Sequence, residues 1–406
     1  MSQFQETTLE NGLRIVGETS QSAVSAAIGF FVKTGARDEE ASLMGVSHFL
    51  EHMMFKGTET RSAEEVDLAF DVIGAQHNAF TSSEMTAFWG ASLPEHIVNV
   101  HDILADILRP SLRQEDFDAE KSVILEEIAM YNDQPFWVLY EQAMEHYYGN
   151  HPLGFRVLGT PETIKNMQRD AMQLYFDHRY SADNTIVAMT GNIDFETMVD
   201  QIQTKCGAWK RTGATRNYHE PSRTAGKCLV EIPELHQHYL IMSMKSVSAQ
   251  DERKYACAAL ASVLGGGDGS RLYWSLVDKG IAEEAGASVD PSDQFGEQMT
   301  YAVCKPENAE QVTDILQNEM ANIATSLTKS DLKRVVAKAA TAAAVSSELP
   351  KGRMQRLGSL VTTTGVYTSL EEELGKIESL TLDDLREAAE SFPWKATLVA
   401  STKHER

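Results

Sequence analysis

Two histidines that lie four residues apart, with a glutamate between them, are the part of this sequence with the clearest chemical potential. His48 and His52 belong to a run of apolar helix formers with no Pro or Gly between Val46 and Lys56, which predicts a helix. Positions four apart share one face of a helix, so the two imidazoles can converge on one ion. Two imidazoles and a carboxylate form a common catalytic zinc set, with a fourth position left for water. One further acid must then come from elsewhere in the chain, and one Glu must stay free as a base.

The order His48-x-x-Glu51-His52 reverses the commoner H-E-x-x-H zinc signature and is known as the inverzincin pattern. A match of five residues also fits a helix with two incidental histidines and a surface glutamate. The candidate third ligand lies in a predicted helix over 113–131. Glu120 and Glu127 are seven apart and share a face there, whereas Glu126 is rotated by about 100°. Viewed alone, that helix is better explained as a solvated acidic face.

The length and composition of the chain limit the classes of protein to which it can belong. A chain of 406 residues fits two domains of roughly 200 residues each. The formal net charge of −23 favours solubility and an acidic surface or cavity, and it argues against nucleic acid as a partner. The four cysteines show no metal-binding spacing. The sequence has no run of about 18 apolar residues, so we expect no membrane span. The N-terminus shows no signal or transit peptide, so we expect a cytoplasmic protein.

The elements that must position the histidines occur twice along the chain. In the first half, a strand-turn-strand with Asn11-Gly12 at its turn and an apolar strand over 24–34 precede the histidine helix. A polar segment over 210–227 reads as a linker, after which a similar order of strands and helices begins again. The last strand, 393–401, mirrors the strand at 184–192. We therefore predict two homologous α+β domains, 1–209 and 228–406, and only the first carries the metal motif.

Several ordered segments together resemble one known family. These are NGLRIV, GVSHFLEHMMFKGT, NAFTSSEMT, VILEEIAMYNDQP, HPLGFRVLGTPETI and LGGGDGSRLY, and His52 and Glu127 are 75 positions apart, as the family pattern requires. The chain resembles, over essentially its whole length, the M16 zinc peptidases, the insulinase and mitochondrial-processing-peptidase family, and its smaller M16B type in particular. The resemblance implies two domains, each a mainly antiparallel sheet with helices on one side, that enclose a chamber.

The resemblance also implies a role for each residue that matches the family motif. His48, His52 and Glu127 would bind one zinc ion per chain, and Glu120 would orient a ligand. Glu51 would be the general base that takes a proton from the attacking water and later protonates the leaving amine. An extended peptide would add as a β-strand to the segment Asn78, Ala79, Phe80 and Thr81. The expected activity is a zinc endopeptidase that acts on peptides or unfolded segments.

One departure from the family pattern concerns the second half of the chain. Active relatives carry an Arg and a Tyr there, seven apart, that help to bind substrate, but this chain has Glu283 where the Tyr is expected and no matching Arg. A dimer is expected in either case. It would be a homodimer, or a heterodimer with a homologous subunit that lacks H-x-x-E-H and supplies the Arg and Tyr. The alternative from another functional class is a non-catalytic scaffold or core subunit with the same fold.

Overall fold

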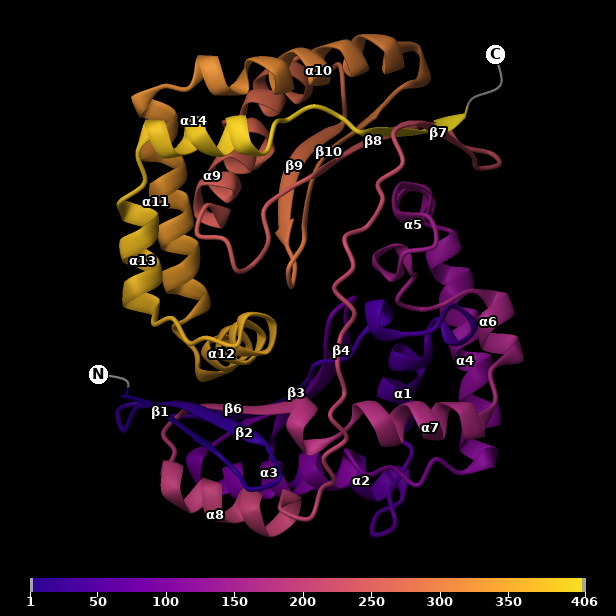
Figure 1. Cartoon of the computed structure of the whole chain (residues 1–406), viewed down its shortest axis with the longest axis vertical. Coiled ribbons are helices and arrows are strands. Elements are labelled where there is room, and N and C mark those ends of the chain that lie inside the picture. Colours follow the sequence, from indigo (N-terminus) through magenta and orange to yellow (C-terminus); the bar gives the residue numbers. More distant parts are fainter. Residues whose placement is uncertain (1–2, 404–406) are drawn as a thin grey trace. The chain divides into compact units, whose positions relative to one another are not determined.

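A computed structural model describes residues 3–403 and shows two β-sheets, one in each of two compact units (Figure 1). Both units are discontinuous in the sequence. The first contains the chain up to Ala129, Phe155–Asn217 and Val345–Tyr367, and the second contains Met130–Gly154, Tyr218–Ala344 and the chain from Thr368. The domain bounds 1–209 and 228–406 stay a prediction of the sequence alone.

The sheet of the first unit has six strands in the order β1-β2-β6-β3-β5-β4. Neighbouring strands are antiparallel, except that β2 and β6 run parallel. The expected turn follows β1, where Gly12 adopts a φ of +89° that favours glycine. The bounds are β1 (Gln3–Thr8), β2 (Arg14–Thr19), β3 (Ala26–Val32), β4 (Gln76–Thr81), β5 (Thr86–Ser92) and β6 (Thr185–Gly191).

Strand alternation gives this sheet two apolar faces. On β3, Ile28 and Phe30 join the larger core beneath the main layer of helices, which confirms the predicted layer on one side. Ala27 and Phe31 point to the opposite face. The helices of the main layer are α1 (Val46–Met54), α2 (Ala63–Val72), α3 (Ile97–Ile107), α4 (Gln114–Asn132), α6 (Pro161–Asn166), α7 (Arg169–Arg179) and α8 (Phe195–Cys206).

One further helix, α12 (Pro350–Thr364), covers the opposite face of the same sheet, although the sequence pattern did not predict it. Its Gly and Thr residues are weak helix formers. The close approach of the helix to the sheet explains Gly358, because a Cβ atom there would lie 2.1 Å from the Phe31 ring. Packing against the sheet therefore stabilises a helix that local propensity disfavours.

The second unit repeats the strand order of the first. Its sheet has the order β7-β11-β8-β10-β9, and again one pair, β7 and β11, runs parallel while the others are antiparallel. This order matches β2-β6-β3-β5-β4, with β6 and β11 in equivalent places, so the predicted duplication is confirmed. The bounds are β7 (Gly226–Glu231), β8 (His238–Lys245), β9 (Glu284–Pro291), β10 (Gly296–Cys304) and β11 (Leu398–Lys403).

The helices of the second unit also cover both faces of their sheet. The main core lies beneath α9, α10 and α14, and the opposite face packs against α5 through Leu139, Ala143 and Tyr147. The first half of the chain thus supplies α5 to the second unit, and the second half supplies α12 to the first unit, which is why both units are discontinuous in the sequence. The bounds are α5 (Pro135–Tyr148), α9 (Lys254–Gly265), α10 (Ala309–Ser326), α11 (Lys329–Ser346), α13 (Leu370–Glu378) and α14 (Leu382–Ser391), of which α13 was also not predicted.

The segment expected to be a linker has no helix or strand before Gly226, but it is not a free tether. Arg216 is buried, and its guanidinium donates hydrogen bonds to both carboxylate oxygens of Asp38 at 2.9 and 2.7 Å. This buried ion pair fixes the first part of the segment to the first unit. Among residues 3–403, no helix combines the length and apolar character that crossing a bilayer would require.

Candidate metal centre

The helix that carries the histidines, α1, follows β3 after a short loop that also anchors its first turn. Gly45 precedes the helix with a φ of +94°, and a Cβ atom there would meet the carbonyl oxygen of Leu158 at 2.7 Å. The Glu39 carboxylate accepts hydrogen bonds from the backbone N–H groups of Gly45 and Ser47 at 2.7 and 2.8 Å. Backbone donors at a helix start need such acceptors. The loop therefore fixes the position of the helix before its first histidine.

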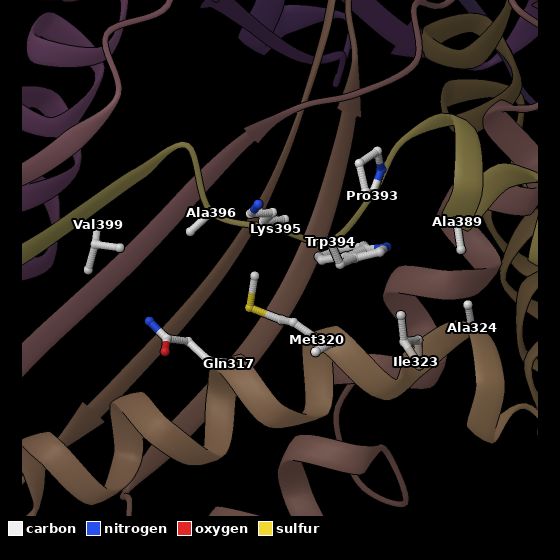
Figure 2. A pocket seen from close by; sticks show the side chains of 11 residues that line it. Gln317, Met320, Ile323, Ala324, Ala389, Pro393, Trp394, Lys395, Ala396 and Val399 are labelled. Atoms are coloured by element: carbon white, nitrogen blue, oxygen red, sulfur yellow. The ribbon is translucent and has the colours of Figure 1, made fainter.

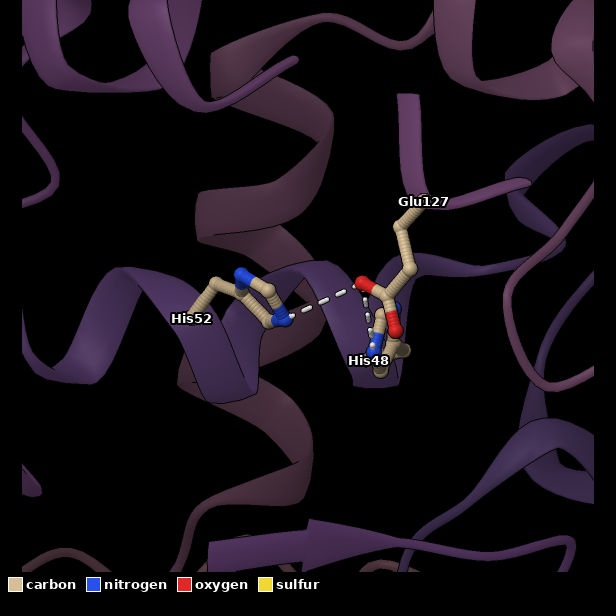
Figure 3. A group of neighbouring side chains, drawn as sticks. All are labelled: His48, His52 and Glu127. Carbon is tan, nitrogen blue, oxygen red and sulfur yellow. Dashed lines mark ion pairs between the residues drawn. The ribbon is translucent and has the colours of Figure 1, made fainter. Parts of the chain in front are cut away.

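The burial of apolar side chains then fixes the rotation of α1 about its axis. Phe49, Leu50 and Met53 are at most 1% exposed and pack into the main core. Their burial leaves the face with His48 and His52 directed away from the sheet, and this face meets α4. Figure 3 shows the two imidazoles on α1 with the Glu127 carboxylate between them.

Helix α4 supplies two acidic groups to this place because its apolar residues fix its rotation. Phe117, Ile124 and Ile128 are buried in the main core. Glu120 and Glu127 both face α1, whereas Glu126 is exposed. The spacing of seven residues therefore correctly identified Glu120 and Glu127 as the carboxylates that share the face toward the histidines, and Glu126 as the one that does not.

The geometry of His48, His52 and Glu127 fits one shared metal ion better than direct hydrogen bonds. Glu127 Oε2 lies 3.7 Å from His48 Nε2 and 3.6 Å from His52 Nε2, and the three ligand atoms lie within 4.8 Å of one another. Two atoms that each bind a tetrahedral zinc at about 2.1 Å are about 3.4 Å apart. No other group of His, Cys, Asp and Glu in residues 3–403 offers such a set.

The two histidines have different electrostatic surroundings. Burial, together with the charge of His52, lowers the pKa of His48 to about 3, so its imidazole is neutral and able to bind a metal. Its Nδ1 atom is buried without a hydrogen-bond partner among the described residues. Burial also opposes protonation of His52, but the hydrogen bond that its ring makes to the Glu120 carboxylate, together with the other nearby carboxylates, outweighs this and raises its pKa.

Glu120 holds the ring of His52 rather than joining the metal set. Its Oε1 lies 2.8 Å from His52 Nδ1, and its Oε2 lies 2.6 Å from Lys56 Nζ. Burial opposes ionisation of Glu120, but the contacts with His52 and Lys56 prevail and lower its pKa. A carboxylate on Nδ1 leaves Nε2 free for a metal, as in many zinc sites. The sequence analysis missed Lys56, which lies just beyond the last residue of α1, Met54.

Glu51 lies next to the metal set and contacts the edge strand of the sheet. Its Oε2 accepts a hydrogen bond from Thr81 Oγ1 at 2.6 Å. Burial raises the pKa of Glu51 above its usual 4.5, although the Thr81 hydrogen bond opposes the shift. A carboxyl group with a raised pKa is suited to take up and return a proton near neutral pH.

The four residues predicted to bind substrate, Asn78 to Thr81, form most of β4, which is the edge of its sheet. Within the described residues β4 pairs only with β5, so its other side carries no strand. Neighbouring His77 stacks on the Phe70 ring with the ring centroids 3.9 Å apart, which agrees with a packing role rather than a ligand role. An open strand edge thus ends at Thr81, the residue that contacts Glu51.

Models of two protein domains match most of the chain. Residues 14–161 match Insulinase (Peptidase family M16), and residues 166–339 match the Peptidase M16 inactive domain. An uncharacterized zinc protease of Streptomyces coelicolor is 33% identical over 94% of this chain and 86% of its own length. The uncharacterized zinc protease YmxG of Bacillus subtilis is 32% identical, with 93% and 92% of the two chains covered.

Solved structures show the same architecture. A protease from Helicobacter pylori superposes with a TM-score of 0.93 at 20% identity and covers 100% of both chains. A chain of complex III2 from Candida albicans has a TM-score of 0.84 at 17% identity and covers 98% of this chain and 95% of that one. The structures establish the fold, and the domain models and relatives establish the family: this chain is a member of peptidase family M16.

Proposed function

We propose that this protein is a zinc-dependent endopeptidase and that its first unit carries the reaction. The observation that supports this proposal most directly is the arrangement of His48, His52 and Glu127 around one point, with Glu51 beside them. A scaffold subunit needs none of these groups. Because the fold also occurs in a chain of complex III2, the fold alone does not separate the two functions.

The donor set suits zinc, which binds two imidazole nitrogens and a carboxylate oxygen in many hydrolytic sites. A bound zinc ion would supply a Lewis acid that polarises the scissile carbonyl and lowers the pKa of water. The neutral His48 and the His52 ring, oriented by Glu120, would hold the ion. Glu51 would take the proton from the attacking water and deliver it to the amine that leaves, because its raised pKa allows both transfers.

Peptide substrates would bind along β4 as an added strand. The free side of this strand offers backbone N–H and C=O groups that an extended peptide can pair with. Pairing of this kind reads the main chain, so it favours unfolded segments of varied sequence. The hydrogen bond between Thr81 and Glu51 ties the end of this strand to the base that would act on the bound peptide.

A dimer is part of the proposal, and so is the closed chamber between the two domains. Glu283, which stands where active relatives have a Tyr, is exposed and hydrogen-bonds to Gln237. A homologous partner without the metal motif would supply the missing Arg and Tyr in a heterodimer. A homodimer would need replacements from this chain.

The decisive experiment is cleavage of a mixed pool of unstructured peptides by the purified chain with zinc, compared with Glu51→Gln. Glu126→Gln is the matched control, because it removes the same charge from an exposed position on α4. We expect cleavage that Glu51→Gln abolishes and Glu126→Gln preserves, with zinc content equal in all three proteins. Bound zinc without cleavage would point to a missing partner subunit, and a chain that binds no zinc would refute the proposal.

A further inference from the structure

The loop 35–39, between β3 and α1, carries three charged side chains that are almost completely removed from solvent. The Arg37 side chain is 2% exposed, the Asp38 side chain is 0% exposed, and Glu39 as a residue is 5% exposed. A charge is buried at a high cost unless it is paired. By contrast, the surface depression in Figure 2, between α10, α14 and the segment that leads into β11, has mostly apolar walls and one ionisable side chain, Lys395. The buried charges therefore make the loop a place with specific partners.

Arg37 joins the loop to the turn between β4 and β5. Its guanidinium forms an ion pair with the Glu84 carboxylate, and its backbone N–H donates to the carbonyl oxygen of Ser83 at 2.9 Å. The loop and the turn approach so closely that a Cβ atom on Gly35 would lie 2.3 Å from the carbonyl oxygen of Ser82. One side chain and the backbone thus hold the turn that directly follows β4.

The two neighbouring residues anchor the loop itself and the metal helix. Asp38 Oδ1 lies 2.5 Å from Arg179 Nη2, and the same carboxylate accepts both hydrogen bonds from Arg216. The Arg216 guanidinium also donates to the carbonyl oxygen of Glu84 at 2.5 Å. Glu39 accepts the hydrogen bonds from the start of α1. The loop is therefore a fixed reference both for the turn after β4 and for the helix that carries the histidines.

The two segments that the loop holds meet again at Glu51. This residue lies on α1, and its Oε2 accepts the hydrogen bond from Thr81, the last residue of β4. Within residues 3–403, no other group hydrogen-bonds to the Glu51 carboxylate. The orientation of this carboxylate therefore depends on where β4 ends, and the ion pair between Arg37 and Glu84 helps to fix that position.

We propose that Arg37 is a positioning residue of the peptidase reaction, because it holds the end of β4 where Thr81 orients Glu51. This role rests on the function proposed above. Arg37 acts through the turn after β4, whereas the zinc ligands lie on α1 and α4. A displacement of about 1 Å can lower a reaction rate by about 100-fold. Loss of the ion pair should therefore lower kcat while zinc binding is kept.

The first experiment measures kcat, KM and zinc affinity for the full chain and its variants. Removal of one partner of a buried ion pair is strongly destabilising, so Arg37→Met/Glu84→Met removes both charges together. We expect kcat for an unstructured peptide to fall by about 10- to 100-fold, with KM and zinc affinity unchanged. Arg37→Lys, which keeps the charge, should give an intermediate kcat. Arg386→Met/Asp383→Met is the matched control, because it removes an exposed ion pair of 2.8 Å on α14.

A further variant separates this role from a merely structural one. In Thr81→Val the hydroxyl that orients Glu51 is removed, so loss of the ion pair between Arg37 and Glu84 should lower kcat little further. An equal fall of kcat with and without the Thr81 hydroxyl would overturn the proposal. An unchanged kcat in Arg37→Met/Glu84→Met, with thermal unfolding to confirm that it is folded, would overturn it as well.

Hydrogen exchange of the zinc-free protein tests the positioning without catalysis. In Arg37→Met/Glu84→Met we expect faster exchange of the backbone N–H at position 37, which donates to Ser83, and unchanged exchange in α1. Equal exchange at position 37 in the variant and the original protein would overturn the proposal. Absence of cleavage by the original protein would bear on the proposed function alone, because the exchange measurement needs no cleavage.

Discussion

Helices α1 and α9 hold equivalent places in the two units, yet only α1 has side chains that could bind a metal ion. Each follows the strand, β3 or β8, that pairs with β6 or β11 in its sheet. On α1, one face is buried and the other presents His48, Glu51 and His52. On α9, the corresponding sequence is KYACAALASVLG, and most of its small apolar residues are buried. The duplicated topology supplies the position, and the residues on one helix face decide the function.

The contact with the edge strand shows how this difference is maintained. In the second unit, a Cβ atom on Gly265 would lie 2.3 Å from the backbone nitrogen of Ala287, so the end of α9 lies directly against β9. In the first unit, a side-chain hydrogen bond between Glu51 and Thr81 links α1 to β4. Direct backbone packing leaves no room for metal ligands, whereas polar side chains at the same place create a site.

Removal of a metal ligand should give the largest effect, because it makes α1 chemically similar to α9. In His48→Ala we expect zinc to be lost and cleavage of unstructured peptides to fall by at least about a thousandfold, since metal catalysis contributes several kcal/mol. Zinc is measured by elemental analysis. Treatment of the original protein with a chelator should have the same effect, and added zinc should reverse it there but not in His48→Ala.

The partner of His52 should have an intermediate effect on the site. In Glu120→Gln the ring loses a charged acceptor, and we expect zinc affinity or activity to fall by about 10- to 100-fold. Competition with a zinc-binding dye measures the affinity. Glu126→Gln is again the control, and an equally small change in both variants would show that the contact between Glu120 and His52 does not matter for binding.

The close packing of α9 predicts a change in stability without a change in chemistry. Gly265→Ala places a methyl group against the backbone of β9 and should lower the free energy of unfolding by about 1–3 kcal/mol, as overpacking usually does. Urea unfolding measures this, and zinc content should not change. Gly375→Ala is the control, because nothing lies within 4 Å of a Cβ atom there, and alanine in this helix should stabilise by about 0.5–1 kcal/mol.

The sheet faces covered by α12 and α5 differ in how they hold a carboxylate. In the first unit, Glu18 has Arg353 and Arg356 within 3.4 and 3.7 Å. In the second, Glu297 accepts a hydrogen bond from Tyr148 at 2.9 Å, and burial raises the pKa of Glu297 to about 7 from 4.5.

This difference predicts a dependence of stability on pH. Because folded Glu297 binds its proton more tightly than the unfolded chain does, the stability from this group is present below about pH 4.5 and is lost as the pH rises to about 7. The slope is at most about 1.4 kcal/mol per pH unit. Urea unfolding at several pH values should show a shallower decline in Glu297→Gln. Parallel curves for the two proteins would contradict the prediction.

Much of the site could be predicted from the sequence because its residues form pairs that lie close together within one helix. His48 and His52 are one helical turn apart, and Glu120 and Glu127 are two turns apart, so each pair shares a face wherever its helix lies. The position of α12 could not be predicted in this way. Its glycines and threonines argue against a helix, and the Phe31 ring that explains Gly358 is more than three hundred positions away.

The sequence by itself therefore determined the duplicated α+β order, the family, and which residues could form a metal site, because periodicity and spacing within a helix or strand are local properties. The tertiary structure decided that α1 and α4 present those residues to one another, that Thr81 contacts Glu51, and that Lys56 pairs with Glu120. It also decided that α12, from the second half of the chain, covers the sheet of the first unit, and that α5, from the first half, covers the sheet of the second unit. These features depend on which apolar faces pack together, and that choice is made by contacts between residues far apart in the chain.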